Sequence, residues 1–383
     1  MSGWKKFKIK DVVYINPENY STKDQWDYIN YLETSNLTEG RIDSLQKIHV
    51  GIDKIPSRAK RKVKVDDVLI STVRPNQKHY GIIRNFVNNF VVSTGFAVLR
   101  ANQDMLDPYY LYLLVTRDNV TEYLSNVAED STTAYPSITP NIIGELDIAL
   151  PPLLEQKAIA EILRSLDDKI DLLHRNNQTL EAMAETIFRQ WFIEEADKFD
   201  KCLFGDEFDI VMGQSPPGNT YNEVGDGIVF FQGRSDFGFR FPTERVYCTS
   251  PKRIAKRFDV LLSVRAPVGD INMAMEECCI GRGLAAIRHK KGYTSYAYYK
   301  VKSLQDEFDV FEREGTVFGA VSKNDLKSIK TTMPSEKLVR KFEDVVSPID
   351  SQIYFNTLQI RTLQSLRNAL LPKLITGEIR VPV

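Results

Sequence analysis

The residues of this chain best suited to chemistry are clustered lysines and arginines, and the chemistry that they suit is phosphate binding. Residues 54–84 contain only two acids, Asp66 and Asp67, but nine cationic residues: Lys54, Arg58, Lys60, Arg61, Lys62, Lys64, Arg74, Lys78 and Arg84. In a second cluster one acid, Asp259, accompanies five: Lys252, Arg253, Lys256, Arg257 and Arg265. A run of charge is often only a solvated surface. Because this one recurs at corresponding places in two halves of the chain, we predict that it contacts nucleic-acid phosphates.

Patterns that would give the chain a reaction of its own are missing. Methyl transfer to an amino group of a base would need a glycine-rich donor loop and an Asn-Pro-Pro-aromatic segment. The nearest match, Ser-Pro-Pro-Gly at 215–218, lacks the aromatic residue, and 16–19 is further off, so both are interpreted as turns. A GxxxxGK[ST] nucleotide loop is absent, and we find no nucleophile with a supporting base. We interpret the adjacent acids at 66–67 and 167–168 as surface residues, and we predict binding without catalysis.

These residues must be positioned by larger elements, and the longest is a helical pattern written twice. Residues 153–191 place apolar side chains at steps of three and four, which keeps one stripe on one face of a helix. The stripe is Ile159, Ile162, Leu166, Ile170, Leu173, Leu180, Ala184, Ile187 and Trp191, with Asn177 in its gap. Roughly 40 residues at about 1.5 Å each make a rod on the order of 60 Å long, which suits a coiled-coil spacer.

The same pattern returns 183 residues later, with Ile159 falling on Phe342. Its members are Phe342, Val345, Ile349, Ile353, Asn356, Ile360, Leu363, Leu370 and Leu374, and only Arg367 breaks it. We predict two fused copies of one unit, each a globular part followed by a long helix, with the two helices packed antiparallel. The alternative is that each helix packs only on its own globular part. Asn177 and Asn356 are predicted to fix the register, whereas Pro348 should kink or interrupt the second helix and Pro372 should end or bend it.

The globular parts read as small twisted sheets with helices. Short alternating segments rich in Tyr, Val, Ile and Phe are separated by Gly, Asn and Pro, as in strands joined by turns. Residues 107–128 are predicted to be helical, and 293–311 take their place in the second copy. Residues 67–69 match 259–261 and 93–100 match 281–288, while the loops between them differ. A shared scaffold with divergent loops favours two sites of different specificity.

Composition limits the class of protein. The chain has 383 residues, a net charge near −1 and 43% hydrophobic residues, and it contains neither a visible signal peptide nor an apolar run near the roughly 18 residues of a membrane span. The acid-rich central helix balances the basic clusters. We expect no metal site and predict reduced thiols in a cytoplasm, because no metal-ligand spacing links the four cysteines, Cys202, Cys248, Cys278 and Cys279, or the four histidines, His49, His79, His174 and His289.

Several stretches resemble one known family. Residues 151–192, PPLLEQKAIAEILRSLDDKIDLLHRNNQTLEAMAETIFRQWF, are similar to the central conserved region of type I restriction-modification specificity subunits. The ending LRNALLPKLITGEIRV (366–381) resembles the family's C-terminal conserved region. The segments YPSIT…LDIALPPLLEQ (135–156) and MGQSPPGNTY (212–221) resemble the exit from a first target-recognition domain and the entry to a second. The resemblance covers essentially the whole chain.

The resemblance implies an α+β fold with two pseudo-repeated target-recognition domains, 1–152 and 195–334. They would be separated by two long antiparallel coiled-coil helices, the central segment 153–194 and the C-terminal segment 335–383. Each domain would read half of an asymmetric site on double-stranded DNA. Two methylation (M) subunits would methylate adenine in the half-sites, and two restriction (R) subunits would supply ATP-driven translocation and cleavage. S-adenosylmethionine, ATP and Mg would bind the partners and none of them this chain, and no membrane is expected.

If the resemblance holds, side chains in loops after strands would read the bases, because phosphate contacts carry little sequence information. Arginine suits guanine, and asparagine or glutamine suits adenine. The candidates are Arg74, Asn76, Gln77 and Lys78 in the first copy, and Gln214, Ser215, Gln232, Arg234, Ser235 and Arg265 in the second. The phosphate candidates are Lys60, Arg61, Lys62, Lys252, Arg253 and Lys256.

Two other functions stay open on the sequence. The chain would be a two-headed, non-catalytic scaffold if its heads bound protein or RNA and its rod set their separation; lack of salt-sensitive binding to a duplex would favour this. A methylating enzyme that needs no partner is disfavoured by the missing donor loop.

Overall fold

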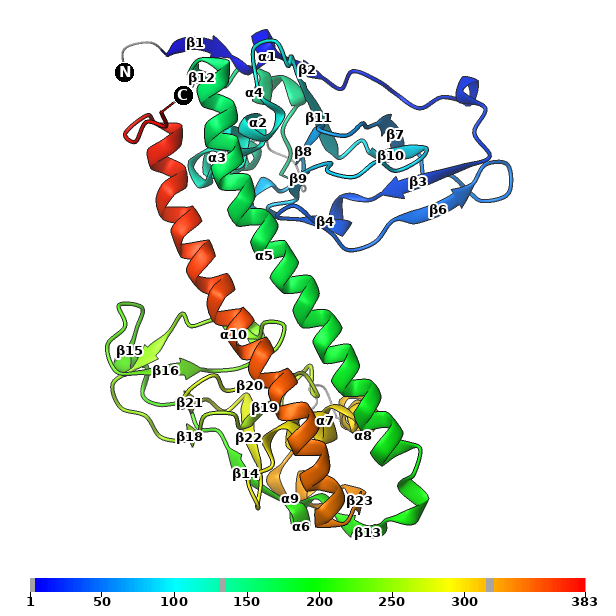
Figure 1. The fold of residues 1–383 in the computed structure, drawn as a ribbon, viewed down its shortest axis with the longest axis vertical. Coiled ribbons are helices and arrows are strands. Elements are labelled where there is room, and N and C mark those ends of the chain that lie inside the picture. The colour runs from blue at the N-terminus through cyan, green and yellow to red at the C-terminus, as the bar shows by residue number, and fades with distance from the viewer. Residues whose placement is uncertain (1–3, 131–135, 315–319, 383) are drawn as a thin grey trace. The chain divides into compact units, whose positions relative to one another are not determined.

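The computed structural model describes residues 4–130, 136–314 and 320–382, and it has an α+β fold, as predicted (Figure 1). The chain divides into two compact units: unit 1 is residues 1–170 with 362–383, and unit 2 is residues 171–361. Two long helices, α5 (Leu153–Phe188) and α10 (Glu336–Ile375), contribute one part to each unit. Within the described residues, every helix falls short of the length and apolar character that crossing a membrane would take.

Unit 1 holds two four-stranded sheets and a strand pair. One sheet has the order β2-β11-β8-β9: Val13–Ile15, Phe96–Ala101, Val68–Ser71 and Tyr80–Ile82. The other has the order β6-β3-β10-β7: Gln46–His49, Tyr28–Leu32, Phe90–Ser93 and Ala59–Lys62. Strand β10 runs parallel to β3 and antiparallel to β7. The remaining strands form the pairs β1–β12 (Lys5–Lys8 with Asp147–Leu150) and β4–β5 (Leu37–Thr38 with Arg41–Ile42).

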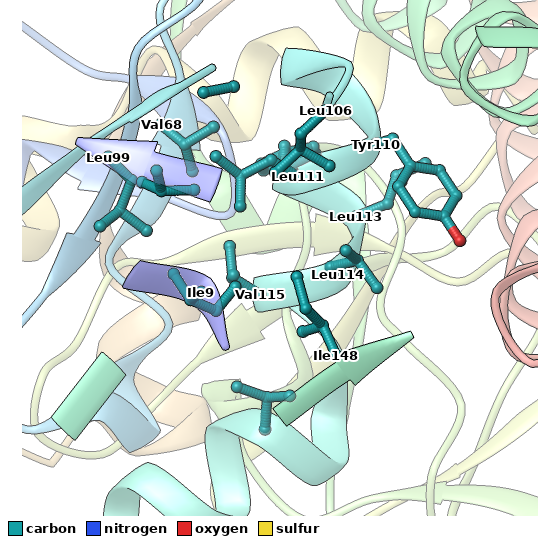
Figure 2. Packing of buried hydrophobic residues seen from close by; sticks show 14 of the residues in the cluster. Ile9, Val68, Leu99, Leu106, Tyr110, Leu111, Leu113, Leu114, Val115 and Ile148 are labelled. Carbon is teal, nitrogen blue, oxygen red and sulfur yellow. The ribbon is translucent and has the colours of Figure 1, made fainter. Parts of the chain in front are cut away.

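The core of unit 1 forms around α2. Its helices are α1 (Ile9–Val12), α2 (Pro108–Val115), α3 (Asp118–Asp130) and α4 (Pro140–Gly144). Asp107 caps α2 by accepting hydrogen bonds from the backbone N–H groups of Tyr109 and Tyr110, and Pro108 stands at the first helical position. Figure 2 shows Leu111 and its neighbours on α2 packed against residues from β8, β11, β12 and α1. The predicted helix 107–128 is thus two helices, α2 and α3.

Unit 2 repeats this order of elements. Its sheets are β14-β22-β19-β20 (Phe208–Met212, Leu284–His289, Val260–Ser263 and Ile271–Met273) and β15-β17-β16-β21-β18 (Tyr221–Asn222, Tyr247–Cys248, Ile228–Phe231, Cys278–Ile280 and Ile254–Ala255). Its strand pair joins β13 (Asp200–Leu203) to β23 (Lys330–Met333), and its helices are α6 (Phe204–Glu207), α7 (Thr294–Lys302), α8 (Gln305–Glu314) and α9 (Lys323–Ser328). Strand β16 runs parallel to β21, as β3 does to β10, and β18 lies at the sheet edge, as β7 does.

One ion pair occurs at the same place in both units. Asp67 is 1% exposed; its carboxylate accepts from the Lys64 backbone N–H and, at 2.8 Å, from both Nε and Nη2 of Arg100. In unit 2, Asp259 likewise accepts from Lys256 N–H and from Arg288 Nε. The interpretation of Asp67 as a surface acid is therefore wrong: it ties a turn to the neighbouring strand.

In unit 1, α5 and α10 are joined by a half-buried acid, Asp167. Arg367 Nε lies 2.7 Å from Asp167 Oδ1, and the Tyr109 hydroxyl also donates to Asp167. The side chain of Asp167 is only 15% exposed, so its interpretation as a surface residue is wrong, whereas Asp168 is 54% exposed and pairs with Arg84. Arg367, which interrupts the apolar stripe, is accounted for because it provides the cation for Asp167.

In unit 2 the two helices meet through the two asparagines of the stripe. Asn356 Nδ2 donates to Asn177 Oδ1 at 2.8 Å, and both residues are buried.

Two members of the predicted stripe, Ile162 and its counterpart Val345, are 38% and 46% exposed; their neighbours Leu163 and Val346 are buried in their place.

Helix α10 stays unbroken at Pro348, so the predicted interruption is wrong. A proline inside a helix costs about 3 kcal/mol. Val346 and Ile353, on either side of it, are fully buried in the core of unit 2, and each such side chain contributes about 1.5–3 kcal/mol. Burial therefore outweighs the lost hydrogen bond. The helix also runs through Pro372 and ends three residues later, at Ile375.

Candidate nucleic-acid interface

The phosphate candidates of unit 1 lie on β7, the last strand of its sheet. Lys60 is exposed, whereas Arg61 and Lys62 are half-buried. Lys62 Nζ bonds to Asp24 Oδ1 at 2.7 Å and lies over the ring of Trp26, and this bond lowers the pKa of the Asp24 carboxyl. Burial lowers the pKa of the Arg61 guanidinium. Lys60 therefore offers its charge to solvent, whereas that of Lys62 is already matched.

The phosphate candidates of unit 2 lie on either side of the corresponding edge strand, β18. Lys252 and Arg253 precede β18 and Lys256 follows it, and all three are exposed. Strand β18 pairs with β21, and Arg253 O accepts from Ile280 N–H at 2.9 Å. Both units thus carry a row of cations along one edge of the sheet with the central parallel pair.

Several base-reading candidates of unit 2 gather at one turn, residues 281–283, which joins β21 to β22. The carbonyl of Gln232 accepts from Gly283 N–H at 3.1 Å, and Ser215 Oγ accepts from Arg282 N–H at 3.4 Å. Next to the turn, Gln214 N–H donates to Ile280 O at 3.0 Å. The structure therefore brings together candidates that lie far apart in the sequence.

The other candidates of unit 2 lie on adjoining segments. Arg265 is exposed and directly follows Val264, whose N–H donates to Gly283 O at 2.9 Å. Arg234 and Ser235 are exposed in a 3₁₀ turn after β16. The guanidinium of Arg234 pairs with Asp270, so its charge is committed in the free chain.

The candidates of unit 1 occupy a single loop after β8. Asn76 and Gln77 are exposed within the 3₁₀ turn Pro75–Gln77. Arg74 and Lys78, on either side, have positive φ angles of 47° and 55°, a conformation that costs non-glycine residues on the order of 1 kcal/mol or more and clusters at functional sites. Lys78 Nζ bonds to Asp118 Oδ1 at 3.1 Å, which raises the pKa of the lysine.

The unit 1 counterpart of the 281–283 turn is residues 93–95, which joins β10 to β11. Thr94 N–H donates to Arg58 O at 2.8 Å, and Gly95 O accepts from Thr72 N–H at 2.7 Å. A Cβ on Gly95 would lie 2.6 Å from Thr34 Oγ1, so this turn is also closely packed. Thr72 lies two positions before the Arg74–Lys78 loop, so its hydrogen bond to Gly95 places the turn near the base-reading candidates of unit 1.

Sequence reasoning missed the middle residue of each turn: Arg282 in unit 2 and Thr94 in unit 1. Residues 281–288 and 93–100 were interpreted as matched scaffold, and the variable side chain within each match was overlooked. The available signal was the Gly-Arg-Gly sequence of 281–283, a large cation between two residues without side chains.

The interior of unit 2 contains a charged cluster outside this surface. Arg240 is 2% exposed; its Nη1 lies 3.2 Å from Asp350 Oδ1 and its Nη2 donates to the Tyr299 hydroxyl at 2.6 Å. Its guanidinium also lies 3.7 Å from the centre of the Tyr298 ring. Burial alone would lower the pKa of Arg240, but the surrounding hydroxyls and carboxylates raise it further than burial lowers it. The cluster attaches the globular part of unit 2 to α10.

In the part of the chain that the structure describes, no three His, Cys, Asp or Glu side chains are grouped so that they could hold a metal ion. Cys202, Cys248, Cys278 and Cys279 are free thiols. Burial raises the pKa of Cys278 and Cys279, which makes them inert packing residues.

Comparisons with known proteins agree on one family. A family model described as "Type I restriction modification DNA specificity domain" matches residues 1–182. The putative type I restriction enzyme MjaX specificity subunit of Methanocaldococcus jannaschii is 28% identical, over 99% of this chain and 94% of that protein. The HindI specificity subunit of Haemophilus influenzae is 32% identical, over 51% of this chain and 42% of that protein.

Solved structures add a likeness in fold. The S subunit of a type I restriction-modification system from M. genitalium superposes with a TM-score of 0.61 at 17% identity, covering 97% of this chain and 96% of that chain. The HsdS subunit from Thermoanaerobacter tengcongensis is 30% identical over 99% of this chain and 98% of that chain, with a TM-score of 0.43.

Proposed function

Because this chain belongs to the family of DNA specificity subunits of type I restriction-modification systems, we propose that it reads an asymmetric DNA site made of two separated half-sites. Residues 1–152 and 195–334 are the target-recognition domains in this proposal, and each reads one half. Segments 153–194 and 335–383 form the spacer. The subunits of this family recognise DNA, so we assign no reaction to the chain itself.

One observation carries the proposal: each unit places a row of cations on or beside an edge strand, next to a turn whose side chains differ between the units. The cations lie on β7 in unit 1 and on either side of β18 in unit 2, and the turns are residues 93–95 and 281–283. Phosphate contacts of this kind position a protein on DNA, and side chains that differ between two otherwise similar readers give each its own sequence. Two such readers in one chain fit an asymmetric site.

The spacer would determine how many base pairs separate the half-sites. Half-sites read from one side of the duplex have centres about 34 Å apart, which is one helical turn. The Asn177–Asn356 hydrogen bond supports a spacer with one fixed helix register, because a shifted register would separate the buried Asn356 Nδ2 donor from the Asn177 Oδ1 acceptor.

The chemistry would come from partners in this proposal. Two methylation subunits would dock on the chain and transfer the methyl group of S-adenosylmethionine to adenine in each half-site. Two restriction subunits, with ATP and Mg, would add translocation and cleavage. The role of this chain is to bind and position the DNA, and the missing donor and nucleotide loops are consistent with this division of labour.

Mapping methylated adenines in cells that express the chain with its methylation subunits tests the function. We expect a single bipartite motif. Replacing residues 1–152 with those of a related subunit should change one half of the motif and leave the other half and the spacing intact. If both halves stayed the same after this exchange, the proposal would be wrong. If the chain with its partners bound no duplex in a salt-sensitive manner, the protein or RNA scaffold would be favoured instead.

A further inference from the structure

The 281–283 turn is held by backbone contacts on both sides, which makes it a rigid mount for its one side chain. Gly281 N–H donates to Phe231 O at 2.8 Å, and Gly283 N–H donates to Gln232 O. A Cβ on Gly281 would lie 2.8 Å from Gln232 Cα, and one on Gly283 would lie 2.6 Å from Gln232 O. Only glycine fits at these two positions, so Arg282 is the one residue of the turn that can present a functional group.

Residues with polar, uncharged side chains flank Arg282. Its backbone N–H meets Ser215 Oγ, and the chain segments of Gln214 and Gln232 flank the turn. Arg282 is exposed, and among the described residues no carboxylate forms an ion pair with it. Arg234, by contrast, is paired with Asp270. Arg282 thus keeps its donors available on a support that loses little conformational entropy when a ligand binds.

The basic edge strand places phosphate-binding charge directly beside the turn. Ile280, the residue before the turn, donates its N–H to Arg253 O and accepts from Gln214 N–H through its carbonyl. Strand β18 with Lys252 and Arg253 therefore lies on one side of Ile280, and the Gln214–Ser215 segment lies on the other. A DNA strand whose phosphates lie along β18 would bring base edges within reach of a long side chain on the adjacent turn.

We propose that Arg282 is a specificity-determining residue that reads a guanine in the half-site recognised by unit 2. The planar guanidinium donates two parallel hydrogen bonds, which match the O6 and N7 acceptors of guanine in the major groove. Gln214, Ser215 and Gln232 are positioned for neighbouring base pairs. The corresponding residue of unit 1, Thr94, lacks this fork of donors, so a guanine contact from this turn is expected in unit 2 and not in unit 1. This inference rests on the proposed function.

The test compares methylation motifs and binding for the full chain assembled with its methylation subunits. Exchanging residues 195–334 first identifies the half-motif read by unit 2. In the Arg282→Ala complex, one guanine of that half should become dispensable, with a loss of discrimination of roughly 5- to 150-fold, and the other half should not change. Arg282→Lys keeps the charge but not the planar fork, so it should retain affinity for DNA while losing part of this discrimination.

A modified base isolates the contact. A duplex with 7-deazaguanine at the identified position lacks the N7 acceptor. It should bind the wild-type complex several-fold more weakly than the normal duplex, whereas the Arg282→Ala complex should bind both duplexes equally. Lys330→Ala is the matched control, since it removes an exposed cation of unit 2 on β23, away from the turn, and it should leave the motif unchanged.

Three results would overturn the proposal for Arg282. These are a unit 2 half-motif without guanine, an Arg282→Ala complex that keeps the full guanine requirement, and a uniform loss of affinity across all sequences, which would mark a phosphate contact. A wild-type methylation map without two half-sites would instead overturn the proposed function itself, and the role of Arg282 with it.

Discussion

Units 1 and 2 share the same framework of buried ion pairs and edge strands, and they differ in the exposed turn beside each edge strand. Asp67–Arg100 and Asp259–Arg288 are equivalent ion pairs, and β7 and β18 are equivalent basic edges. The turns beside those edges read Ser-Thr-Gly in unit 1 and Gly-Arg-Gly in unit 2. The comparison teaches that the buried charges maintain the fold of each unit, and this leaves the exposed turn free to vary.

The units also attach to the long helices in comparable but different ways. Asp167 on α5 and Asp350 on α10 are equivalent by the 183-residue shift, and each receives a tyrosine hydroxyl, from Tyr109 and Tyr299 respectively. The arginine partner comes from α10 in unit 1 (Arg367) but from a loop in unit 2 (Arg240). The position of the acid is preserved, while its cation comes from a different part of the chain.

The largest expected effect comes from removing the cation in unit 2. Arg240→Ala leaves the largely buried carboxylate of Asp350 without its arginine, while Glu181 keeps Lys302, and the change should destabilise unit 2 by about 3–5 kcal/mol. Denaturant unfolding measures the loss, and hydrogen exchange should locate it in residues 171–361. Arg340→Ala on the exposed face of α10 serves as the control and should leave the unfolding midpoint unchanged. Equal loosening of both units would contradict the role assigned to Arg240.

The equivalent ion pairs should give equal effects in the two units. Asp67→Asn and Asp259→Asn each weaken two charge-assisted hydrogen bonds to an arginine, and each should cost about 2–3 kcal/mol in the free energy of unfolding. Adding Arg100→Ala to Asp67→Asn should cost less than the sum of the two single changes, since they remove the same contact. Full additivity would show that the pair does not couple β8 to β11.

In the asparagine pair between the helices, a first substitution by leucine should lower the stability and a second one should raise it again. Asn177→Leu alone leaves the amide of Asn356 without its partner in a buried site and should cost about 1–3 kcal/mol. The double change Asn177→Leu with Asn356→Leu should recover most of that stability. Thermal unfolding measures both, and size-exclusion chromatography shows whether the double variant has begun to self-associate. A double variant as unstable as the single one would argue against a direct bond.

The smallest effect is expected on the edge strands. Lys60→Ala and Lys252→Ala each remove one exposed cation, so each should weaken DNA binding about equally for all sequences and reduce the slope of log K against log salt by about 1. Lys62→Ala should change the slope less, because Asp24 already neutralises Lys62. Binding titrations at several salt concentrations measure this. A change in the motif, instead of in the slope, would place these lysines among the base readers.

The sequence was sufficient for features that depend on local periodicity. The two long helices, the duplication and the matched anchors at 67–69 and 259–261 follow from spacing alone, because side chains three and four residues apart share a helix face. Burial of Asp67 and Asp167 could not be predicted this way, since their partners Arg100 and Arg367 are distant in the sequence. Pro348 was misjudged because the packing that holds the helix together is tertiary.

The candidate surface was predictable only in part. The edge-strand cations were identified because charge is visible in a sequence. The reading residues were assigned to different loops in the two units, since loop position relative to the sheet is not encoded by any short pattern. Arg282 was overlooked because its neighbours matched the first copy so well that the difference at one position went unnoticed.

The asparagine pair also discriminates between a chain's own second helix and a copy of its first. By the 183-residue shift, Asn356 corresponds to Leu173 of α5, and Asn177 corresponds to Ile360 of α10. Two α5 helices from separate molecules, paired in the same register, would each bury Asn177 against a leucine. With about 1–3 kcal/mol lost for each unsatisfied amide, the mismatch counts twice per dimer. Because the two long helices are similar, a helix of one molecule resembles the natural partner of the same helix in another. The Asn177–Asn356 hydrogen bond joins non-equivalent positions, and it therefore favours the pairing of α5 with α10 of the same chain.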